Sequence, residues 1–168
     1  TICGGKLPDV DIVGLLELKL KYHHKGDIKV IYSMADTKHY IPMPEIPGEK
    51  DFNPYYMMLK MDINKPLYIC NHILCIVNYQ QDGMTSRVLQ SYEECPVSYA
   101  MLREAYLEHQ EIPCMFAYRQ CIHYVSSWIF AKRQKKKVNS LWRRKLVWMA
   151  VIPGVILNMW VSWKNRSA

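Results

Sequence analysis

The segment LVWMAVIPGVILNMWVSW (146–163) directly follows the cationic segment AKRQKKKVNSLWRRK (131–145). Its eighteen residues carry no charge, and as a helix they would extend over about 27 Å, close to the roughly 30 Å hydrocarbon thickness of a bilayer. Tryptophans lie at both ends of the segment, as is typical of residues at membrane interfaces. We therefore expect a transmembrane helix over 141–163 and a short tail over 164–168.

The centre of this segment carries signals of bending and close packing. Pro153 removes one backbone donor and frees a carbonyl one turn earlier, which predicts a bend in the transmembrane helix. Gly154 leaves room for a neighbouring helix, and Asn158 offers an interhelical hydrogen bond. These three residues predict packing against other protein. The alternative is a turn between two short buried strands of a soluble core.

Charge is distributed unevenly along the chain. Residues 1–111 contain all 15 acidic residues and 11 of the 22 Lys and Arg residues, whereas residues 112–168 contain the other 11 and no acid. A cationic tail indicates a negatively charged partner, and cations beside an apolar segment favour anionic lipid. The positive side is expected to face the cytoplasm or the mitochondrial matrix. The predicted lipid contacts are Lys135, Lys136, Lys137, Trp142, Arg143, Arg144 and Lys145.

The first 111 residues are expected to form a soluble head. Leucines alternate with lysines before Gly26 and apolar residues resume after it, which predicts a β-hairpin over 18–32. Four prolines in 41–54 predict an extended arm. Residues 66–79 fit a strand or a helix, and a helix opened by Pro96 is expected to expose Arg103. The predicted fold class is mixed and mainly α-helical, with a helical middle.

A second apolar stretch, CMFAYRQCIHYVSSWIFA (114–131), contains Arg119 and His123. A cation at the centre of a bilayer costs at least about 2.5 kcal/mol. We therefore expect an amphipathic or interfacial helix and a basic segment over 112–140, with a second transmembrane helix as the alternative.

Cysteine and histidine recur at short spacing in two places. Thiolates and imidazoles can bind zinc tetrahedrally, so one hypothesis is a site formed by Cys70, Cys75, Cys121 and His123. The alternatives are an oxidised pair or, the favoured interpretation, packing thiols without a metal or cofactor. The chain contains no dinucleotide, P-loop, serine-hydrolase or zinc-protease motif, so we do not expect an enzyme or a small-molecule substrate.

Together these features are similar to those of a broad class, the small basic accessory subunits of mitochondrial inner-membrane assemblies such as ATP synthase or respiratory-chain complexes. The resemblance implies a non-catalytic structural subunit that contacts other subunits and an anionic phospholipid such as cardiolipin. Its head would lie on the matrix side, or on the cytoplasmic side of another organelle membrane. The alternatives are a soluble nucleic-acid-binding protein, for example a ribosome-associated subunit, and a thiol or zinc protein.

Overall fold

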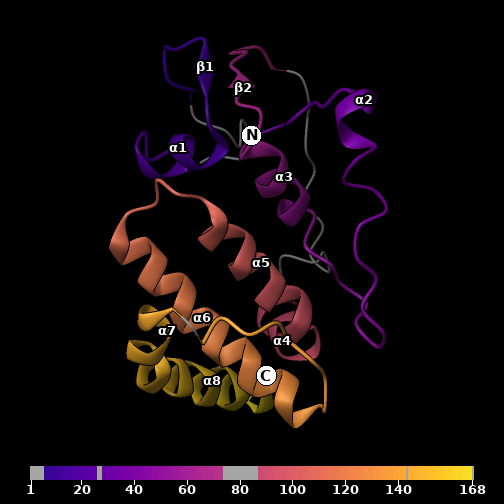
Figure 1. Cartoon of the computed structure of the whole chain (residues 1–168), viewed down its shortest axis with the longest axis vertical. Helices are drawn as coiled ribbons and strands as arrows, with labels where there is room; N and C mark the ends of the chain where they lie inside the picture. Colours follow the sequence, from indigo (N-terminus) through magenta and orange to yellow (C-terminus); the bar gives the residue numbers. More distant parts are fainter. Residues whose placement is uncertain (1–5, 26–27, 74–86, 143, 168) are drawn as a thin grey trace. The chain divides into compact units, whose positions relative to one another are not determined.

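The structure, a computed structural model, describes residues 6–25, 28–73, 87–142 and 144–167. The chain divides into two compact units. Unit 1 contains residues 1–43 and 57–81, and unit 2 contains residues 44–56 and 82–168. The described residues form eight helices and one pair of short strands (Figure 1). The prediction of a mainly α-helical chain is therefore confirmed.

Unit 1 contains a small antiparallel sheet and short helices. Strand β1 (Ile12–Val13) pairs with β2 (Leu67–Tyr68), with Ile12 opposite Tyr68 and Val13 opposite Leu67. Helices α1 (Leu15–Leu20) and α2 (Met34–Thr37) lie in this unit, and α3 (Tyr55–Asp62) begins in unit 2 and ends in unit 1. Strand β2 comes from the segment 66–79, of which 74–79 lie outside the described residues.

The predicted β-hairpin over 18–32 is wrong, because its first part is helix α1 and residues 28–32 form no strand. The alternating leucines and lysines also fit a helix that buries leucines on one side. Glu17 accepts a hydrogen bond from the amide of Gly14 and pairs with Lys21 one turn later at 2.6 Å. The carboxylate of Asp62 accepts the first two amides of α1 at 2.6 and 3.3 Å. The backbone amides at the start of α1 are therefore satisfied by Asp62, which lies far away in the sequence, and no local capping signal predicts this start.

Unit 2 is a helical assembly built around one central helix. Helix α6 packs against α5, α7 and α8, and its side chains Cys121, Tyr124 and Val125 are fully buried in the core. The remaining helices are shorter or peripheral (Figure 1). The bounds are α4 (Val88–Glu94), α5 (Pro96–Glu108), α6 (Cys114–Arg133), α7 (Lys145–Met149) and α8 (Val151–Arg166). The predicted boundary at residue 111 lies within this unit, between α5 and α6.

The proline-rich segment 41–54 contains no helix or strand, and from residue 44 it belongs to unit 2. Its residue Glu49 accepts hydrogen bonds from the amides of Val97 and Ser98 at 2.9 and 2.8 Å, and from the Ser98 hydroxyl at 2.6 Å. Lys136 approaches the same carboxylate at 3.1 Å, and the Glu49 side chain is only 1% exposed. A buried carboxylate at the start of α5 is stabilised by free amides and by the helix dipole.

The prediction of a transmembrane helix over 141–163 is not supported. The segment forms two helices that break at Ala150, and within the described ranges no helix is both long and apolar enough to cross a membrane. The chain breaks at Ala150 where a bend at Pro153 was predicted. Pro153 lies in the first turn of α8 and has no backbone N–H to donate to the Met149 carbonyl. The Tyr118 hydroxyl donates to the Met149 carbonyl instead, at 3.2 Å. The alternative of two buried strands is also wrong.

Helix α8 packs on α6 through small and polar residues. A Cβ on Gly154 would lie 2.6 Å from both Cβ and Cγ1 of Val125, so only glycine permits this approach. One turn later the Asn158 side-chain amide, 1% exposed, donates to the Ser126 carbonyl at 3.1 Å. Two of the three residues expected to contact another helix, Gly154 and Asn158, therefore contact α6 of the same chain.

Replacing Gly154 with alanine is expected to lower the free energy of unfolding by about 1–2 kcal/mol. The added methyl collides with Val125, and overpacking of about 1–3 kcal/mol exceeds the gain of at most about 1 kcal/mol in helix propensity. The thermal midpoint should fall by about 3–6 °C. Calorimetry of Gly154→Ala, Val125→Ala and the double variant measures the coupling. Losses that simply add, or a rise in midpoint for Gly154→Ala, would contradict the close contact.

Candidate functional site

The main candidate site is an exposed apolar surface along α7 and α8, called the outer face below. Its side chains recur every three or four residues and are 39–74% exposed. They are Trp148, Met149, Ile152, Val155, Ile156, Met159, Trp160 and Trp163. Large exposed apolar surfaces are typical of sites that contact another protein or a membrane.

The outer face results from the packing side of α8. The buried positions of this helix are Gly154, Asn158, Val161 and Ser162, which share one side at helical spacing. The closest contacts with α6 are made by small and polar residues, Gly154 and Asn158, and apart from Val161 and Leu157 the large apolar side chains lie on the opposite side. The helix is thus the reverse of an ordinary surface helix, whose apolar side faces the core.

Exposed cations lie at both ends of the outer face. Arg144 directly precedes α7 and Lys145 is its first residue, whereas Lys164 and Arg166 lie in the last turn of α8. No described residue of α7 or α8 is acidic. Cations that flank an apolar surface are placed to contact anionic groups at the edge of that surface.

The predicted lipid contacts differ in their availability. Lys135 and Lys137 are exposed, but Lys136 is partly buried and already paired with Glu49. Trp142 packs against two other indoles, with ring centroids 5.3 Å from Trp128 and 5.2 Å from Trp148. Arg143 lies outside the described residues.

The basic loop after α6 is held in a fixed geometry. Lys135 adopts a left-handed conformation with φ of 58°, and the amide of Lys136 donates to the Ala131 carbonyl at 2.8 Å. This pattern closes the helix end with Lys135 where glycine is usual. The Tyr124 hydroxyl further binds the loop by accepting from the Leu141 amide at 3.1 Å.

A second group of polar residues lies between α4, α5 and α6. Arg103 was expected to be exposed, but it is partly buried and lies over the Tyr106 ring at 6.0 Å. Its Nη1 donates to Gln120 Oε1 at 3.1 Å. Burial lowers the pKa of Arg103; the neighbouring tyrosines act in the opposite direction, and Arg119 lowers the pKa further. The sequence gives one signal that was missed, the tyrosines on either side of Arg103 at 99 and 106.

His123 belongs to the same group. Its Nδ1 lies 3.3 Å from the Tyr92 hydroxyl, which donates to the His123 carbonyl at 2.9 Å. Burial, and then the charges of Arg103 and Arg119, lower the pKa of His123 to about 4. The imidazole is therefore neutral at physiological pH.

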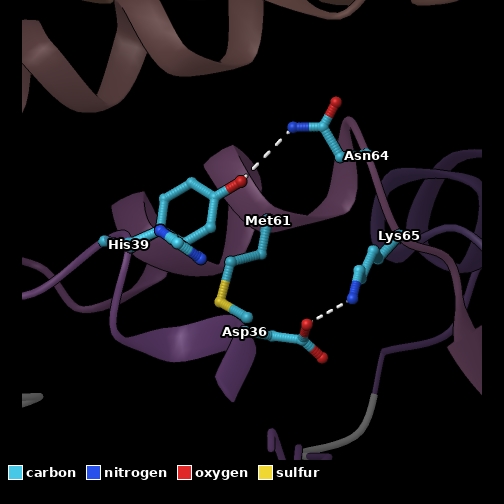
Figure 2. A pocket seen from close by; sticks show the side chains of 6 residues that line it. Asp36, His39, Met61, Asn64 and Lys65 are labelled. Carbon is cyan, nitrogen blue, oxygen red and sulfur yellow. Dashed lines mark hydrogen bonds and ion pairs between the residues drawn. The ribbon is translucent and has the colours of Figure 1, made fainter. Parts of the chain in front are cut away.

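A pocket of about 250 Å³ lies in unit 1 (Figure 2). Its polar groups bind one another: Lys65 pairs with Asp36, and the Asn64 amide donates to the Tyr40 hydroxyl at 3.3 Å. Ser33 donates to the second Asp36 oxygen at 2.7 Å. The hydrogen bonds from Lys65 and Ser33 lower the pKa of Asp36, so this carboxylate is held ionised. An engaged carboxylate of this kind is poorly suited to act as a general acid.

The hypothetical zinc ligands are not brought together in the described residues. Cys70 is exposed in unit 1, whereas Cys121 is fully buried in unit 2 and His123 lies two residues further along the same helix. Cys75 lies outside the described residues. Among the residues that the structure describes, no three His, Cys, Asp or Glu side chains are grouped to hold a metal ion, and Cys70, Cys95, Cys114 and Cys121 are free thiols.

Comparison of the chain with protein-family models, curated proteins and solved structures gives no match. The outer face provides an extended surface, and the group around Arg103 provides a localised one.

The low pKa of His123 predicts a loss of stability in acid. The unfolded chain binds a proton at this residue below about pH 6.5, whereas the folded chain binds it only near pH 4. The free energy of unfolding should therefore fall as the pH drops from 6.5 to 4, by on the order of 2 kcal/mol from this residue. Above pH 6.5 the contribution of His123 should no longer change with pH.

Urea unfolding of His123→Gln at pH 7 and at pH 4.5 measures this contribution. The variant should lose less stability between the two pH values than the native chain does. The matched control is His39→Gln, which changes an exposed histidine of unit 1. An equal acid loss in His123→Gln and in the native chain would disprove the assignment.

Proposed function

We propose that the protein is a non-catalytic accessory subunit that attaches to an anionic membrane through the outer face of α7 and α8. The observation that carries the proposal is the row of large apolar side chains on the solvent side of α8. In this arrangement α8 lies in the plane of the membrane interface. Its sixteen residues would extend over about 24 Å of that surface.

The proposed contact is favoured by the burial of apolar area. Full burial of one large apolar side chain contributes about 1.5–3 kcal/mol, and a helix of this kind enters the interface by about 5–10 Å. Tryptophans at both ends of the outer face suit the boundary between acyl chains and headgroups, where an indole keeps its N–H among polar groups. Several such side chains together are sufficient for stable attachment.

The charges favour anionic lipid in particular. Exposed Arg144, Lys145, Lys164 and Arg166 flank the outer face, and each cation near an anionic surface contributes about 1 kcal/mol. A cardiolipin-rich membrane, such as the mitochondrial inner membrane, has the required charge. In our proposal the head contacts other subunits of a complex such as ATP synthase or a respiratory-chain complex on the matrix side.

Binding to vesicles is the experiment that tests this proposal. The native chain should co-sediment with phosphatidylcholine vesicles that contain 20 mol% cardiolipin, and more weakly with phosphatidylcholine alone. Met159→Asp removes apolar contact and adds a negative charge at the centre of the outer face. The apparent affinity for cardiolipin vesicles should fall at least tenfold.

The matched control is Met34→Asp, which makes the same change at an exposed methionine of unit 1 (73% exposed, against 62% for Met159). This variant should bind like the native chain. If the native chain does not sediment with cardiolipin vesicles, or if both variants lose affinity equally, the outer face is not a membrane contact. Retention of a protein partner without lipid would then assign the outer face to a subunit interface.

A further inference from the structure

The pocket of unit 1 lies between the segment around α2 and the end of α3 (Figure 2). Its volume of about 250 Å³ is below the roughly 300–1,000 Å³ of pockets for drug-sized ligands, so it suits a smaller molecule. Backbone turns fix both walls: the Tyr40 amide donates to the Thr37 carbonyl at 2.9 Å, and the Lys65 amide donates to the Met61 carbonyl at 3.0 Å. The lining side chains are Asp36, His39, Tyr40, Met61, Asn64 and Lys65.

The pocket presents one charge of each sign side by side. Lys65 pairs with Asp36, whose second carboxylate oxygen accepts from the Ser33 hydroxyl at 2.7 Å. The side chains of Asp36 and Lys65 are 33% and 61% exposed, so a ligand in the pocket can reach both charges. The pair carries no net charge, which favours a ligand that is also neutral overall but has a group of each sign.

Hydrogen-bonding capacity remains around the cavity. An ammonium group has three N–H donors, and Lys65 uses one of them on Asp36. The Tyr40 hydroxyl accepts from the Asn64 amide at 3.3 Å and keeps its own proton for donation. Within the described part of the chain, the His39 ring and the side-chain oxygen of Asn64 have no hydrogen-bond partner. The pocket therefore offers both donors and acceptors to a small polar ligand.

We infer that this pocket binds a small zwitterion, namely a free α-amino acid with an apolar side chain. The ligand carboxylate accepts hydrogen bonds from the ammonium of Lys65, the hydroxyl of Tyr40 and the ring of His39. The ligand ammonium donates to the carboxylate of Asp36 and to the side-chain oxygen of Asn64. Each charge of the ligand thus meets the opposite charge of the pocket.

The apolar part of the ligand contacts Met61. This residue lies in the last turn of α3 and is 4% exposed. Figure 2 shows its side chain between the Asn64–Tyr40 and Asp36–Lys65 pairs. A methionine side chain is flexible and polarisable, so it adapts to hydrocarbon groups of different shape.

The amino-acid site goes beyond the proposed membrane contact and is independent of it. The pocket belongs to unit 1, whereas the outer face belongs to unit 2. Failure of vesicle binding would therefore leave the amino-acid site untouched, and the reverse also holds. The site binds its ligand without chemical change, because the hydrogen bonds from Lys65 and Ser33 lower the pKa of Asp36 and keep it ionised.

Calorimetric titration of the full chain with L-leucine at pH 7 tests the inference. Leucine should bind saturably and raise the thermal midpoint. Two further probes carry the same apolar group with a single charge: isocaproate lacks the ammonium of leucine, and isoamylamine lacks its carboxylate. Each should bind at least tenfold more weakly than leucine, because it meets only one of the two charges of the pocket.

Lys65→Met removes the ammonium but keeps an unbranched apolar side chain, and it should weaken leucine binding at least tenfold. The lost ion pair is largely exposed, so the fold should be retained. The matched control is Lys29→Met, the same change at an exposed lysine of unit 1 outside the pocket, which should leave the affinity unchanged. Asp36→Asn should weaken the binding of leucine but not that of isocaproate.

Three results would overturn the inference. The first is the absence of saturable leucine binding. The second is equal affinity of the native chain for leucine and isocaproate, a comparison that needs no variant. The third is equal leucine binding by Lys65→Met and Lys29→Met, because the effect is then one of overall charge.

Discussion

The close contact between α6 and α8 at Gly154 is the constraint on which the rest of unit 2 depends. A Cβ at this position would lie 2.6 Å from the Val125 side chain, so the two helices approach at a distance that only glycine allows. The hydrogen bond from Asn158 to the Ser126 carbonyl continues the same contact. Because α8 uses its small and polar side here, its tryptophans, isoleucines and methionines lie on the outside.

The same contact explains the break in the C-terminal segment. Pro153 has no amide hydrogen for the Met149 carbonyl, and the Tyr118 hydroxyl on α6 takes that acceptor at 3.2 Å. The chain can therefore turn from α7 into α8 without leaving this carbonyl unsatisfied. Pro153, Gly154 and Asn158 thus act together to position α8 on α6.

Glu49 has a comparable role at the start of α5. It joins three separate parts of the sequence, since it lies in the proline-rich segment, accepts the first amides of α5 and pairs with Lys136 after α6. One side chain thus fixes the arm, the start of a helix and the basic loop. Because Lys136 is paired with Glu49, it is unavailable to a lipid or nucleic acid. Lys135 and Lys137 are the exposed lysines of the basic loop.

The sequence was sufficient to predict a mainly helical chain and to single out Pro153, Gly154 and Asn158 as residues suited to helix packing. It could not show that the helix they meet is in the same chain, because the residue types at a close contact are the same within a chain and between chains. The eighteen uncharged residues resembled a transmembrane helix because length and hydropathy do not show which side of a helix is covered. Alternating leucine and lysine fitted a strand as well as α1, since the capping residue Asp62 lies more than forty positions away.

Arg103 was assigned to solvent because charged residues are usually exposed. It lies over the Tyr106 ring, and its Nη1 donates to Gln120 on α6, seventeen residues further along the chain. Such groupings follow from tertiary packing and have no signature in local periodicity. Glu49 was missed for the same reason, since its partners lie nearly fifty and nearly ninety residues further along the chain.

In our proposal α8 lies flat in an anionic membrane with its outer face towards the lipid. Spin labels on Ile152→Cys, Ile156→Cys and Met159→Cys, in a chain whose other cysteines are serine, measure the depth of each position in cardiolipin-containing vesicles. All three labels are expected to be accessible to oxygen, shielded from an aqueous nickel chelate and at one shallow depth of about 5–10 Å. A depth that increases steadily along α8, or free access of the chelate to all three, would contradict it.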